Sequence, residues 1–545
     1  MANVKFPRKE FEKALGKTIS PEIEEKIHLF GTPVESLSEN EIEIEIFPNR
    51  PDLLSMQGFL RSFKAFLGDN KYLGLKKYSL KKPEKNYKIK IESSVKEIRP
   101  YTVCAIIKKL KFTNESIKEI IDLQEKLHNT IGRNRKKVAI GIYPLEKIKL
   151  PITYKAMSPE KIKFTPLEYD KELSGRQILT KHPTGRDYAH LLEDFDKFPV
   201  FIDANSKILS MPPVINSHET GKITESTSEV FVECSGSDFQ TLNKTLNIIV
   251  TTLSDIGGEI YQMSLDYGNK KYTTPSLNHE KIKISLEEIK KLLGIDLKES
   301  DLQKLLQKMG YNYKNKEVEI PAWRCDILHP IDITEDIAIS YGYDKFTPKI
   351  PEISTIGEES KESKFSTKLR EILIGLGLIE ISSYHLIKQE EANIFKLKNP
   401  LEVSNSKTEY KILRPNLLIP SLRILSENKD NEYPQKIFEI GTVFNLNKKE
   451  TSISENENLI IAFSPANFTE LKQILDYLFS SIETQYKIKE SEYPHLIHGR
   501  TASIYINNKN IGYIGEVHPQ TLSDFKIKMP VSIIEISLKE IFSLF

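Results

Sequence analysis

The sequence has few cysteines and no excess of charge of either sign. Its three cysteines, Cys104, Cys234 and Cys325, are far apart among 545 residues and odd in number, so we expect neither a disulfide framework nor a zinc cluster. Lys+Arg number 78 and Asp+Glu 76, which argues against a chain that coats nucleic acid evenly. Local basic patches such as residues 132–137 remain. This composition indicates a cytoplasmic protein.

Long apolar runs and phosphate-binding loops are also missing. No stretch of about 18 apolar residues occurs, and the first residues lack the apolar core of a signal peptide, so we expect no membrane association. Neither GxxxxGK[ST] nor a strand-led GxGxxG is present, because IGLGL at residues 374–378 lacks the third glycine and the context. The chain therefore has no P-loop or Rossmann nucleotide site of its own.

The patterns that are present predict an α+β multidomain protein. Residues 1–88 form a first α+β domain, with an alternating strand at 41–47 and a helix ending at Gly68. The lysine-rich residues 75–90 read as a linker. Residues 90–268 mix strands and helices in a second domain.

The second half of the chain predicts two further domains. Residues 276–348 hold short capped helices beginning near Ser285 and Ser300, a strand and an acidic helix, and resemble a small winged-helix-like module. A polar linker at 353–364 follows. Residues 362–545 predict a large antiparallel sheet with flanking helices.

The acidic helix carries an unusual concentration of carboxylates. Asp332, Glu335 and Asp336 fall at i, i+3 and i+4 and share one face, and Asp326 lies just upstream. Either the positive end of the helix dipole accommodates these anions or a magnesium ion lies among them. The pattern alone leaves both readings open.

A second candidate region is the polar stretch Leu209–Asp238. Its Ser, Thr and Asn side chains surround tight turns and suit either a polar ligand site or a plain loop. His218 lies near Ser210 and Ser217, but the stretch indicates no Ser/His/Asp triad.

Five separated blocks, in order, carry a resemblance to a known family. The blocks are FPNRPDLLSMQGF, SMPPVINSHETGKIT, PAWRCDILHPIDITEDIAISYGYDK, LRPNLLIPSLRILSENK with YPQKIFEIGTVF, and HGRTASIYI with IGEVHP. They are similar to the β subunits of phenylalanyl-tRNA synthetases of the archaeal and eukaryotic-like type. The resemblance implies an (αβ)2 heterotetramer that binds phenylalanine tRNA, in which the α subunit uses ATP to activate phenylalanine.

The resemblance also implies that the last domain is a class II synthetase-like module without catalysis. Class II chemistry needs a motif 2 arginine on the ATP α-phosphate and a motif 3 arginine at the nucleotide end. No Phe-Arg-x-Glu precedes KIFEIGTVF, and no GxGxxxR occurs in the last strands. We therefore expect no aminoacylation residues in this chain and a packing role against the α subunit.

Two sets of site residues follow from the resemblance. The acidic block implies magnesium ligands at the contact with the α subunit, namely Asp326, Asp332, Glu335 and Asp336. The second domain is similar to an editing module that hydrolyses tyrosyl-tRNA, with Ser210, Glu233 and Ser235 in its pocket and Asn216 and Phe201 as further members. Glu233 would accept the tyrosyl hydroxyl, while Ser210 and Ser235 would hold the ester or the attacking water.

The pocket departs from the family pattern at three positions. The family commonly has aspartate and threonine where Glu233 and Ser235 stand, and an aliphatic residue at Phe201. Two alternatives therefore accompany the main interpretation: a free-standing tRNA deacylase, and a non-enzymatic scaffold subunit with an inactive editing pocket. Arg50, between two prolines, is expected to hold a carboxylate of another domain or a phosphate.

Overall fold

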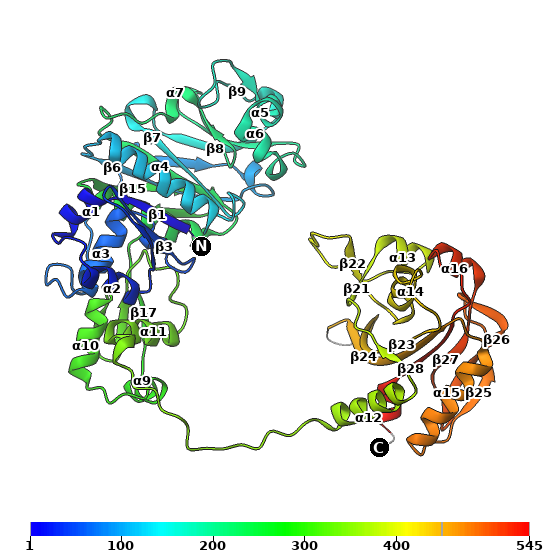
Figure 1. Cartoon of the computed structure of the whole chain (residues 1–545). Helices are drawn as coiled ribbons and strands as arrows, with labels where there is room; N and C mark the ends of the chain where they lie inside the picture. The colour runs from blue at the N-terminus through cyan, green and yellow to red at the C-terminus, as the bar shows by residue number, and fades with distance from the viewer. Residues whose placement is uncertain (1, 448–450, 544–545) are drawn as a thin grey trace. The chain divides into compact units, whose positions relative to one another are not determined.

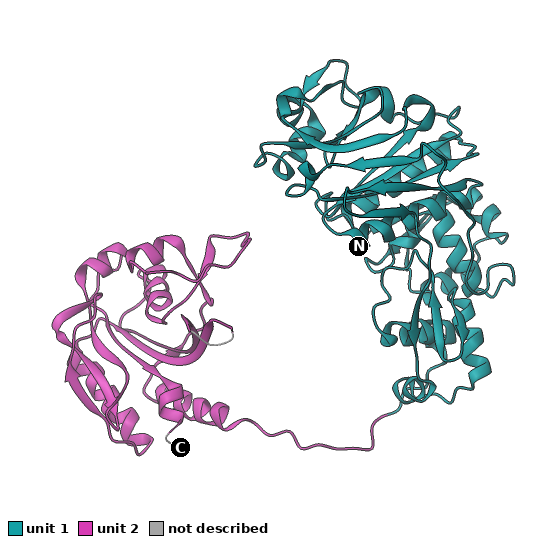
Figure 2. Cartoon of the chain, turned by 180° about the vertical axis from the view of Figure 1, so that it is seen from behind, with its two compact units in different colours: residues 1–349 teal, residues 350–545 magenta. Residues whose placement is uncertain are grey.

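The computed structural model describes residues 2–447 and 451–543 and divides into two compact units, Met1–Lys349 (unit 1) and Ile350–Phe545 (unit 2) (Figures 1 and 2). Unit 1 contains a large hydrophobic core with members from Val4 to Ile337 and a smaller second cluster with members from Ile162 to Val214. Among the described residues, no helix combines the length and apolarity needed to cross a membrane.

Unit 1 begins with a three-stranded antiparallel sheet in the order β1-β3-β2. Its strands are β1 (Ala2–Pro7), β2 (Val34–Leu37) and β3 (Glu41–Ile46), and its helices are α1 (Arg8–Leu15), α2 (Pro21–Leu29) and α3 (Met56–Phe66). Ile42, Ile44 and Ile46 of β3 are all buried, which confirms the face predicted from the alternation. Gly68 follows α3 with a φ of 83°, as expected of a residue that ends a helix.

The middle of unit 1 is an eleven-stranded sheet. Nine strands follow the order β13-β12-β11-β8-β5-β15-β6-β14-β7, and β4 and β16 both pair with β15. The strands are β4 (Leu80–Lys81), β5 (Lys88–Ile91), β6 (Tyr101–Lys108), β7 (Val138–Pro144), β8 (Ile152–Met157), β11 (Phe198–Ile202), β12 (Ile208–Met211), β13 (Ile215–Asn216), β14 (Val230–Gly236), β15 (Glu259–Asp266) and β16 (Lys271–Thr274). The long helices are α4 (Asn114–Asn129) and α8 (Phe239–Asp255), and α8 packs on β6 and β14.

The two ends of this strand path come together. The Tyr143 hydroxyl on β7 donates a hydrogen bond to Asn216 Oδ1 on β13 at 3.2 Å. The sheet is therefore strongly curled, and side chains from its first and last strands meet.

The interpretation of residues 75–90 as a linker is wrong. β4 and β5 lie in this stretch and pair in parallel with β15. Ile89 and Ile91 are buried while Lys88 and Lys90 are exposed, so the lysines occupy the outer face of a strand. Their high density hid a two-residue alternation that is only four residues long.

The last part of unit 1 is a small sheet in the order β17-β19-β18 with three helices. These elements are β17 (Glu280–Lys283), α9 (Leu286–Leu293), α10 (Glu299–Lys308), β18 (Asn312–Lys314), β19 (Glu317–Ile320) and α11 (Pro330–Tyr341). Ser285 caps α9 as predicted. The second helix begins near Ser300 as predicted, at Glu299, but Lys298 and not Ser300 is at the N-cap of α10, so the predicted cap is wrong.

Unit 2 is a seven-stranded sheet in the order β20-β23-β24-β28-β27-β26-β25, antiparallel except for the parallel pair β20–β23. Its strands are β20 (Ile379–Glu380), β23 (Gln435–Leu446), β24 (Ile453–Ser464), β25 (Lys487–Glu490), β26 (Leu496–Ile506), β27 (Lys509–Val517) and β28 (Ser532–Ser537). Two hydrophobic clusters flank it, one with α12 (Lys361–Gly375) and α15 (Phe468–Ser481), the other with α14 (Leu418–Glu427). This is the antiparallel sheet with flanking helices that the sequence predicts.

Candidate functional site

Three of the five residues predicted for the polar pocket lie together in the curled sheet of unit 1. Ser210 on β12 pairs with Asn216 on β13, and Asn216 reaches the Tyr143 hydroxyl on β7. That hydroxyl also lies 3.2 Å from Glu233 Oε1 on β14, so its single hydrogen is shared between the two acceptors. Ser210, Asn216 and Glu233 thus surround Tyr143, a residue that the sequence analysis did not single out.

Glu233 is the most perturbed acid of this group. Its side chain is only 2% exposed, and burial raises its pKa to about 8, although Arg99 and the Tyr143 hydroxyl act to lower it. Glu233 Oε2 and Ser210 Oγ have no hydrogen-bond partner among the described residues. At neutral pH the carboxyl is mostly protonated, so it can donate one hydrogen bond and accept another.

The other two predicted residues are walls of this region. Ser235 is fully buried, and Arg99 donates from Nε to its Oγ at 3.1 Å and from Nη2 to its carbonyl at 2.5 Å. Phe201 is fully buried and stacks on Tyr154 with ring centroids 4.4 Å apart. Neither side chain is open to a ligand in this arrangement.

Glu233 and Asn216 line a cavity of about 130 Å³, called here the Glu233 cavity, together with Glu125, His128, Arg135 and His182. Arg135 Nη2 donates to Glu125 at 2.9 Å, and its Nη1 donates to the Val214 carbonyl at 2.8 Å. Glu125, His128 and Arg135 come from α4 and the turn after it, about one hundred residues before Glu233 in the chain. The sequence shows the basic stretch at 132–137, but it does not show that Arg135 of this stretch lines the same cavity as Glu233.

Gly141 on β7 makes room for the contact between Tyr143 and Glu233. A Cβ atom at this position would overlap the Tyr143 hydroxyl and lie 2.6 Å from Glu233 Oε1. We expect Gly141→Ala to lower the free energy of unfolding by about 1–3 kcal/mol, because buried atoms must move to accept it. Denaturant unfolding measures this. Gly357→Ala, where nothing lies within 4 Å, is the control and should have no comparable effect.

The four carboxylates predicted for magnesium line a second cavity, called here the acidic cavity. Its volume is about 690 Å³, and its other walls include Phe30, Asn49 and Arg50 from the first part of unit 1. The Arg50 fork binds Asp52, with both hydrogen bonds at 2.9 Å, so its carboxylate is a near neighbour in sequence and the predicted partner from another domain is wrong. The predicted residues are Asp326, Asp332, Glu335 and Asp336.

The guanidinium of Arg324 lies among these acids, where a metal ion was predicted. Its Nε and Nη2 donate to the two oxygens of Asp326 at 2.8 and 2.7 Å, and Nη2 also donates to Asp336 at 2.8 Å. Tyr311 donates a further hydrogen bond to Asp336. Burial acts to raise the pKa of Asp326, but the charge and hydrogen bonds of Arg324 bring it below its ordinary value.

The other two acids have different surroundings. Asp332 accepts hydrogen bonds from the backbone N–H groups of Leu328 and His329 at 2.8 and 2.7 Å, which stabilises the start of α11. Glu335 is exposed. The helix-start explanation therefore accounts for Asp332, and pairing with arginine accounts for Asp326 and Asp336.

The described residues do not hold a preformed site for a bare metal ion. No three carboxylate, imidazole or thiol groups in residues 2–447 and 451–543 converge closely enough to ligate one. The four acids that line the cavity carry, together with Asp52, five negative charges, and the guanidinium groups of Arg50 and Arg324 that pair with Asp52, Asp326 and Asp336 carry two positive charges, so these residues together keep a net negative charge. A hydrated divalent cation suits such a cavity better than a dehydrated one.

The sheet of unit 2 buries an ion pair between an arginine and a glutamate. Arg414 Nη1 lies 2.7 Å from Glu439 Oε1 on β23, and its Nε donates to the Thr442 carbonyl at 2.8 Å. Arg414 is only 1% exposed, so its guanidinium is occupied by the protein itself.

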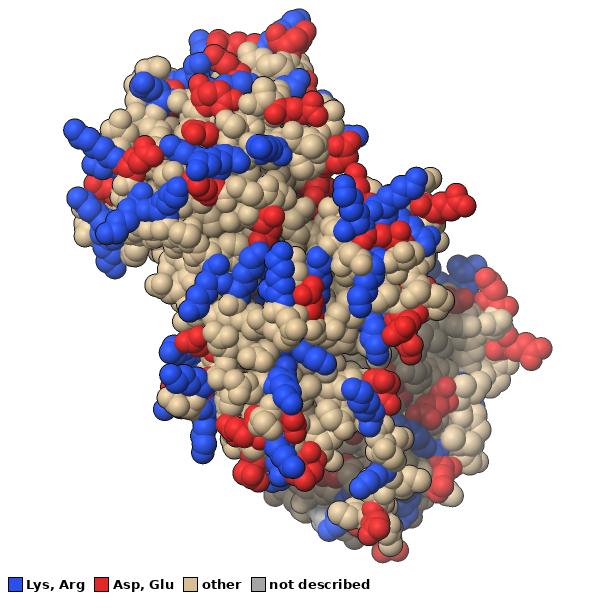
Figure 3. All heavy atoms as spheres, turned by 90° about the vertical axis from the view of Figure 1, so that its left-hand side faces the viewer, with Lys and Arg blue, Asp and Glu red and all other residues tan. Residues whose placement is uncertain are grey.

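The surface of the chain mixes charges of both signs. On the face drawn in Figure 3, Lys and Arg side chains are interspersed with Asp and Glu, which matches the net charge of +2. This face offers local contacts to a polyanion and shows no continuous basic band.

Two family models match the chain. One is described as the phenylalanyl tRNA synthetase beta chain CLM domain and matches residues 347–538; the other is the tRNA synthetase B5 domain and matches residues 282–343. The phenylalanine–tRNA ligase beta subunit of Thermococcus sibiricus is 37% identical over 507 residues, which cover 90% of this chain and 89% of that protein. The subunit of the same name from Thermococcus kodakarensis is 34% identical, covering 98% of both chains.

A solved structure matches the first part of the chain. It is an N-terminal fragment of the phenylalanyl-tRNA synthetase beta subunit from Pyrococcus horikoshii, with a TM-score of 0.60 and 36% identity. The match covers 62% of this chain and 99% of that fragment.

Proposed function

The chain belongs to the family of phenylalanine–tRNA ligase β subunits, and from that premise we propose that it works as the β subunit of such a ligase, assembled with an α subunit in an (αβ)2 heterotetramer. The complex attaches phenylalanine to its tRNA at the expense of ATP, in the cytoplasm. The observation that carries this proposal is the identity of 34% that extends over 98% of both chains.

The proposal assigns amino-acid activation to the α subunit. Unit 2 has no motif 2 or motif 3 arginine in its sequence, and Arg414, which is buried beside β23, is held by Glu439. A nucleotide phosphate needs a free guanidinium or ammonium group in a dry site. Unit 2 therefore supports the α subunit by packing.

The test of this assignment is the activity of the chain alone and in complex. We expect the purified chain to give no ATP–pyrophosphate exchange with phenylalanine, and the exchange and tRNA charging to appear when the α subunit is added. Tight ATP binding or exchange by the lone chain would contradict the proposal. Adding an unrelated class II synthetase subunit is the control and should restore nothing.

Editing of tyrosyl-tRNA at the Glu233 cavity is a further part of the proposal. A hydrophobic pocket discriminates weakly against an added hydroxyl, so a second site that hydrogen-bonds this group improves accuracy. Glu233 lines this cavity, and its Oε2 is a buried polar atom without a partner among the described residues, which supports a polar substrate group next to it. Deacylation of tyrosyl-tRNA by the assembled enzyme is the measurement that tests it.

Magnesium is proposed at the acidic cavity as a hydrated ion. Asp332 and Glu335 line the cavity without an arginine partner among the described residues, while Arg324 already neutralises part of Asp326 and Asp336. An ion that keeps its waters can reach these oxygens without displacing Arg324. Its binding is tested by the magnesium dependence of stability when Arg324 is replaced.

A further inference from the structure

A third cavity of unit 1 is lined by three arginines and two lysines. Its volume is about 390 Å³, and we call it the Arg61 cavity after the residue at its centre. Arg61 lies on α3, Lys71 and Lys76 follow that helix, and Asp255 is the last residue of α8. Trp323, Arg324 and Arg50 complete the charged and aromatic part of the wall.

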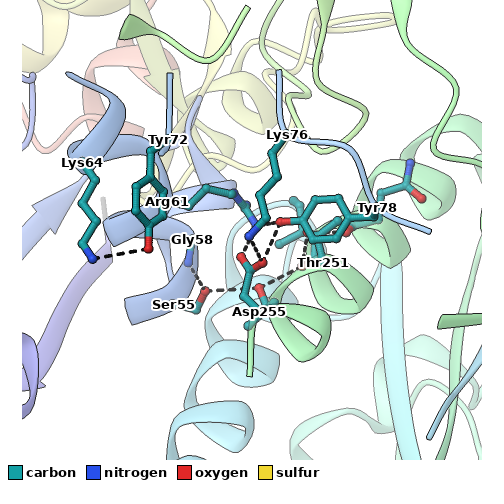
Figure 4. A network of polar contacts seen from close by, with 12 residues as sticks. Ser55, Gly58, Arg61, Lys64, Tyr72, Lys76, Tyr78, Thr251 and Asp255 are labelled. Atoms are coloured by element: carbon teal, nitrogen blue, oxygen red, sulfur yellow. Dashed lines mark hydrogen bonds and ion pairs between the residues drawn. The ribbon is translucent and has the colours of Figure 1, made fainter. Parts of the chain in front are cut away.

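Asp255 binds only one side of the Arg61 guanidinium. Arg61 Nη1 donates to Asp255 Oδ2 at 2.7 Å and to the Tyr78 hydroxyl at 2.9 Å. Lys76 Nζ and the Tyr78 hydroxyl both donate to Asp255 Oδ1, at 2.6 and 2.8 Å. Figure 4 shows Asp255 between these three side chains. Both of its oxygens are engaged, so Asp255 has little left to offer the rest of Arg61.

The opposite edge of Arg61 has no partner. Nε and Nη2 of Arg61 are buried and make no hydrogen bond to any described residue, although the whole side chain is only 6% exposed. Trp323 lies against the face of the Arg61 guanidinium, with Arg61 Cζ 4.4 Å from the centroid of the indole ring. The unpartnered N–H groups lie in the plane of the guanidinium and therefore do not point at the ring. Buried donors of a charged group are costly to leave unpaired.

Two neighbouring arginines show what this edge of a guanidinium binds. In Arg50 and in Arg324, which line the same cavity, Nε and Nη2 donate side by side to the two oxygens of Asp52 and Asp326. In Arg61, the corresponding Nε and Nη2 groups have no carboxylate partner among the described residues. A planar or tetrahedral oxyanion supplies the pair of oxygens that it needs.

The charge around Arg61 indicates the class of anion. Arg50 and Arg324 are balanced by their own carboxylates. Arg61, Lys71 and Lys76 contribute three positive charges against one negative charge of Asp255. Lys71 is exposed, and its Nζ has no hydrogen-bond or ion-pair partner in the described parts of the chain. We propose that the Arg61 cavity binds a phosphate-type oxyanion, held by the free Nε/Nη2 fork of Arg61 and by Lys71 and Lys76.

Such an anion would join parts of unit 1 that are distant in sequence. Its binding residues come from α3, from the segment after it and, through Asp255 and Trp323, from contacts with α8 and the segment before α11. A ligand that binds only the folded state raises the melting temperature by mass action. Free phosphate, pyrophosphate and the phosphate of a nucleotide share this chemistry.

Trp323 makes the site measurable, because it is the only tryptophan in the sequence. The full-length chain is titrated with inorganic phosphate, pyrophosphate and AMP in separate arms, with chloride at matched ionic strength to remove screening effects. We expect a saturable change in tryptophan fluorescence and a higher melting temperature with at least one anion. The arm with the highest affinity identifies the source of the phosphate.

Matched variants separate this site from a general salt effect. Arg61→Lys keeps the charge and loses the fork, so we expect affinity to fall about 10-fold or more. Lys71→Gln should weaken binding roughly twofold to fivefold, while Lys77→Gln, which removes the same charge outside the cavity, should not. If Arg61→Lys does not fold, the comparison of anion affinity between Lys71→Gln and Lys77→Gln still tests the proposal. No saturable change with any of the three anions, or equal affinity in all variants, would overturn the proposal.

Discussion

Replacing Arg324 with methionine is expected to lower the free energy of unfolding by about 3–5 kcal/mol, because it leaves buried carboxylates without their cation. Arg324 is 3% exposed and binds both Asp326 and Asp336. Denaturant unfolding followed by Trp323 fluorescence measures the loss next to the changed residue. Arg176→Met is the matched control, since Arg176 pairs with Glu160 at the surface and should cost about 0–1 kcal/mol.

The pH dependence of this loss has a definite sign. The pKa of Asp326 is lowered from 3.8 in the folded protein, so its pairing contributes stability above that value and loses it as the pH falls. The difference between wild type and Arg324→Met should therefore shrink in acid. A difference that stays constant down to about pH 3 would mean that lost packing, and not lost charge, causes the effect.

The same variant tests magnesium binding. Without Arg324, the carboxylates of Asp326 and Asp336 are free, and magnesium should raise the melting temperature of the variant more than that of the wild type. Calcium and matched sodium chloride are the controls for ion type and screening. If magnesium has no effect on either protein, the acidic cavity is not a magnesium site in the chain by itself.

Replacing Glu233 with glutamine is expected to change the pH dependence of stability by several kcal/mol. The folded protein holds a proton on Glu233 up to about pH 8, while the unfolded chain releases it near its ordinary value of 4.5. Between these values the folded state binds more protons, so wild-type stability falls as pH rises, by up to about 1.4 kcal/mol per pH unit. Glutamine is neutral throughout and avoids this loss.

Unfolding measurements at about pH 5, 7 and 9 compare the two proteins over this window. We expect Glu233→Gln to gain on the wild type as the pH rises and the gain to level off above about pH 8. Glu146→Gln is the control, because Glu146 is exposed on the same unit. A gain that does not depend on pH would show that Glu233 is ionised in the folded protein.

The Glu233 variants also test editing. A protonated carboxyl and a carboxamide can each donate and accept one hydrogen bond, so the assembled enzyme with Glu233→Gln should keep more tyrosyl-tRNA deacylation than one with Glu233→Ala. We expect the alanine variant to lose about 10-fold or more, with phenylalanine charging unchanged. Equal deacylation in all three enzymes would favour the scaffold alternative with an inactive pocket.

The sequence by itself determined the local elements and the membership of the family. The alternating isoleucines of β3, the helix end at Gly68 and the antiparallel sheet of unit 2 all follow from periodicity and capping, which act within a few residues. The absence of the class II motif 2 and motif 3 arginines also followed from the sequence alone, because a missing motif can be recognised without a structure.

The tertiary structure decided which groups meet. The family resemblance implied that Asp326 and Asp336 are metal ligands, but neither the resemblance nor the spacing shows that Arg324 turns toward them. Ser235 and Phe201 were predicted as members of the editing pocket. In the structure Arg99 hydrogen-bonds Ser235, and Tyr154 stacks on Phe201. Tyr143 contacts Glu233, which is 90 residues away in the chain. Arg61 is held on one side by Asp255, which is 194 residues away. The energy of a buried charge depends on all its neighbours in space, and those neighbours are set by the curl of the sheet and by packing between distant segments.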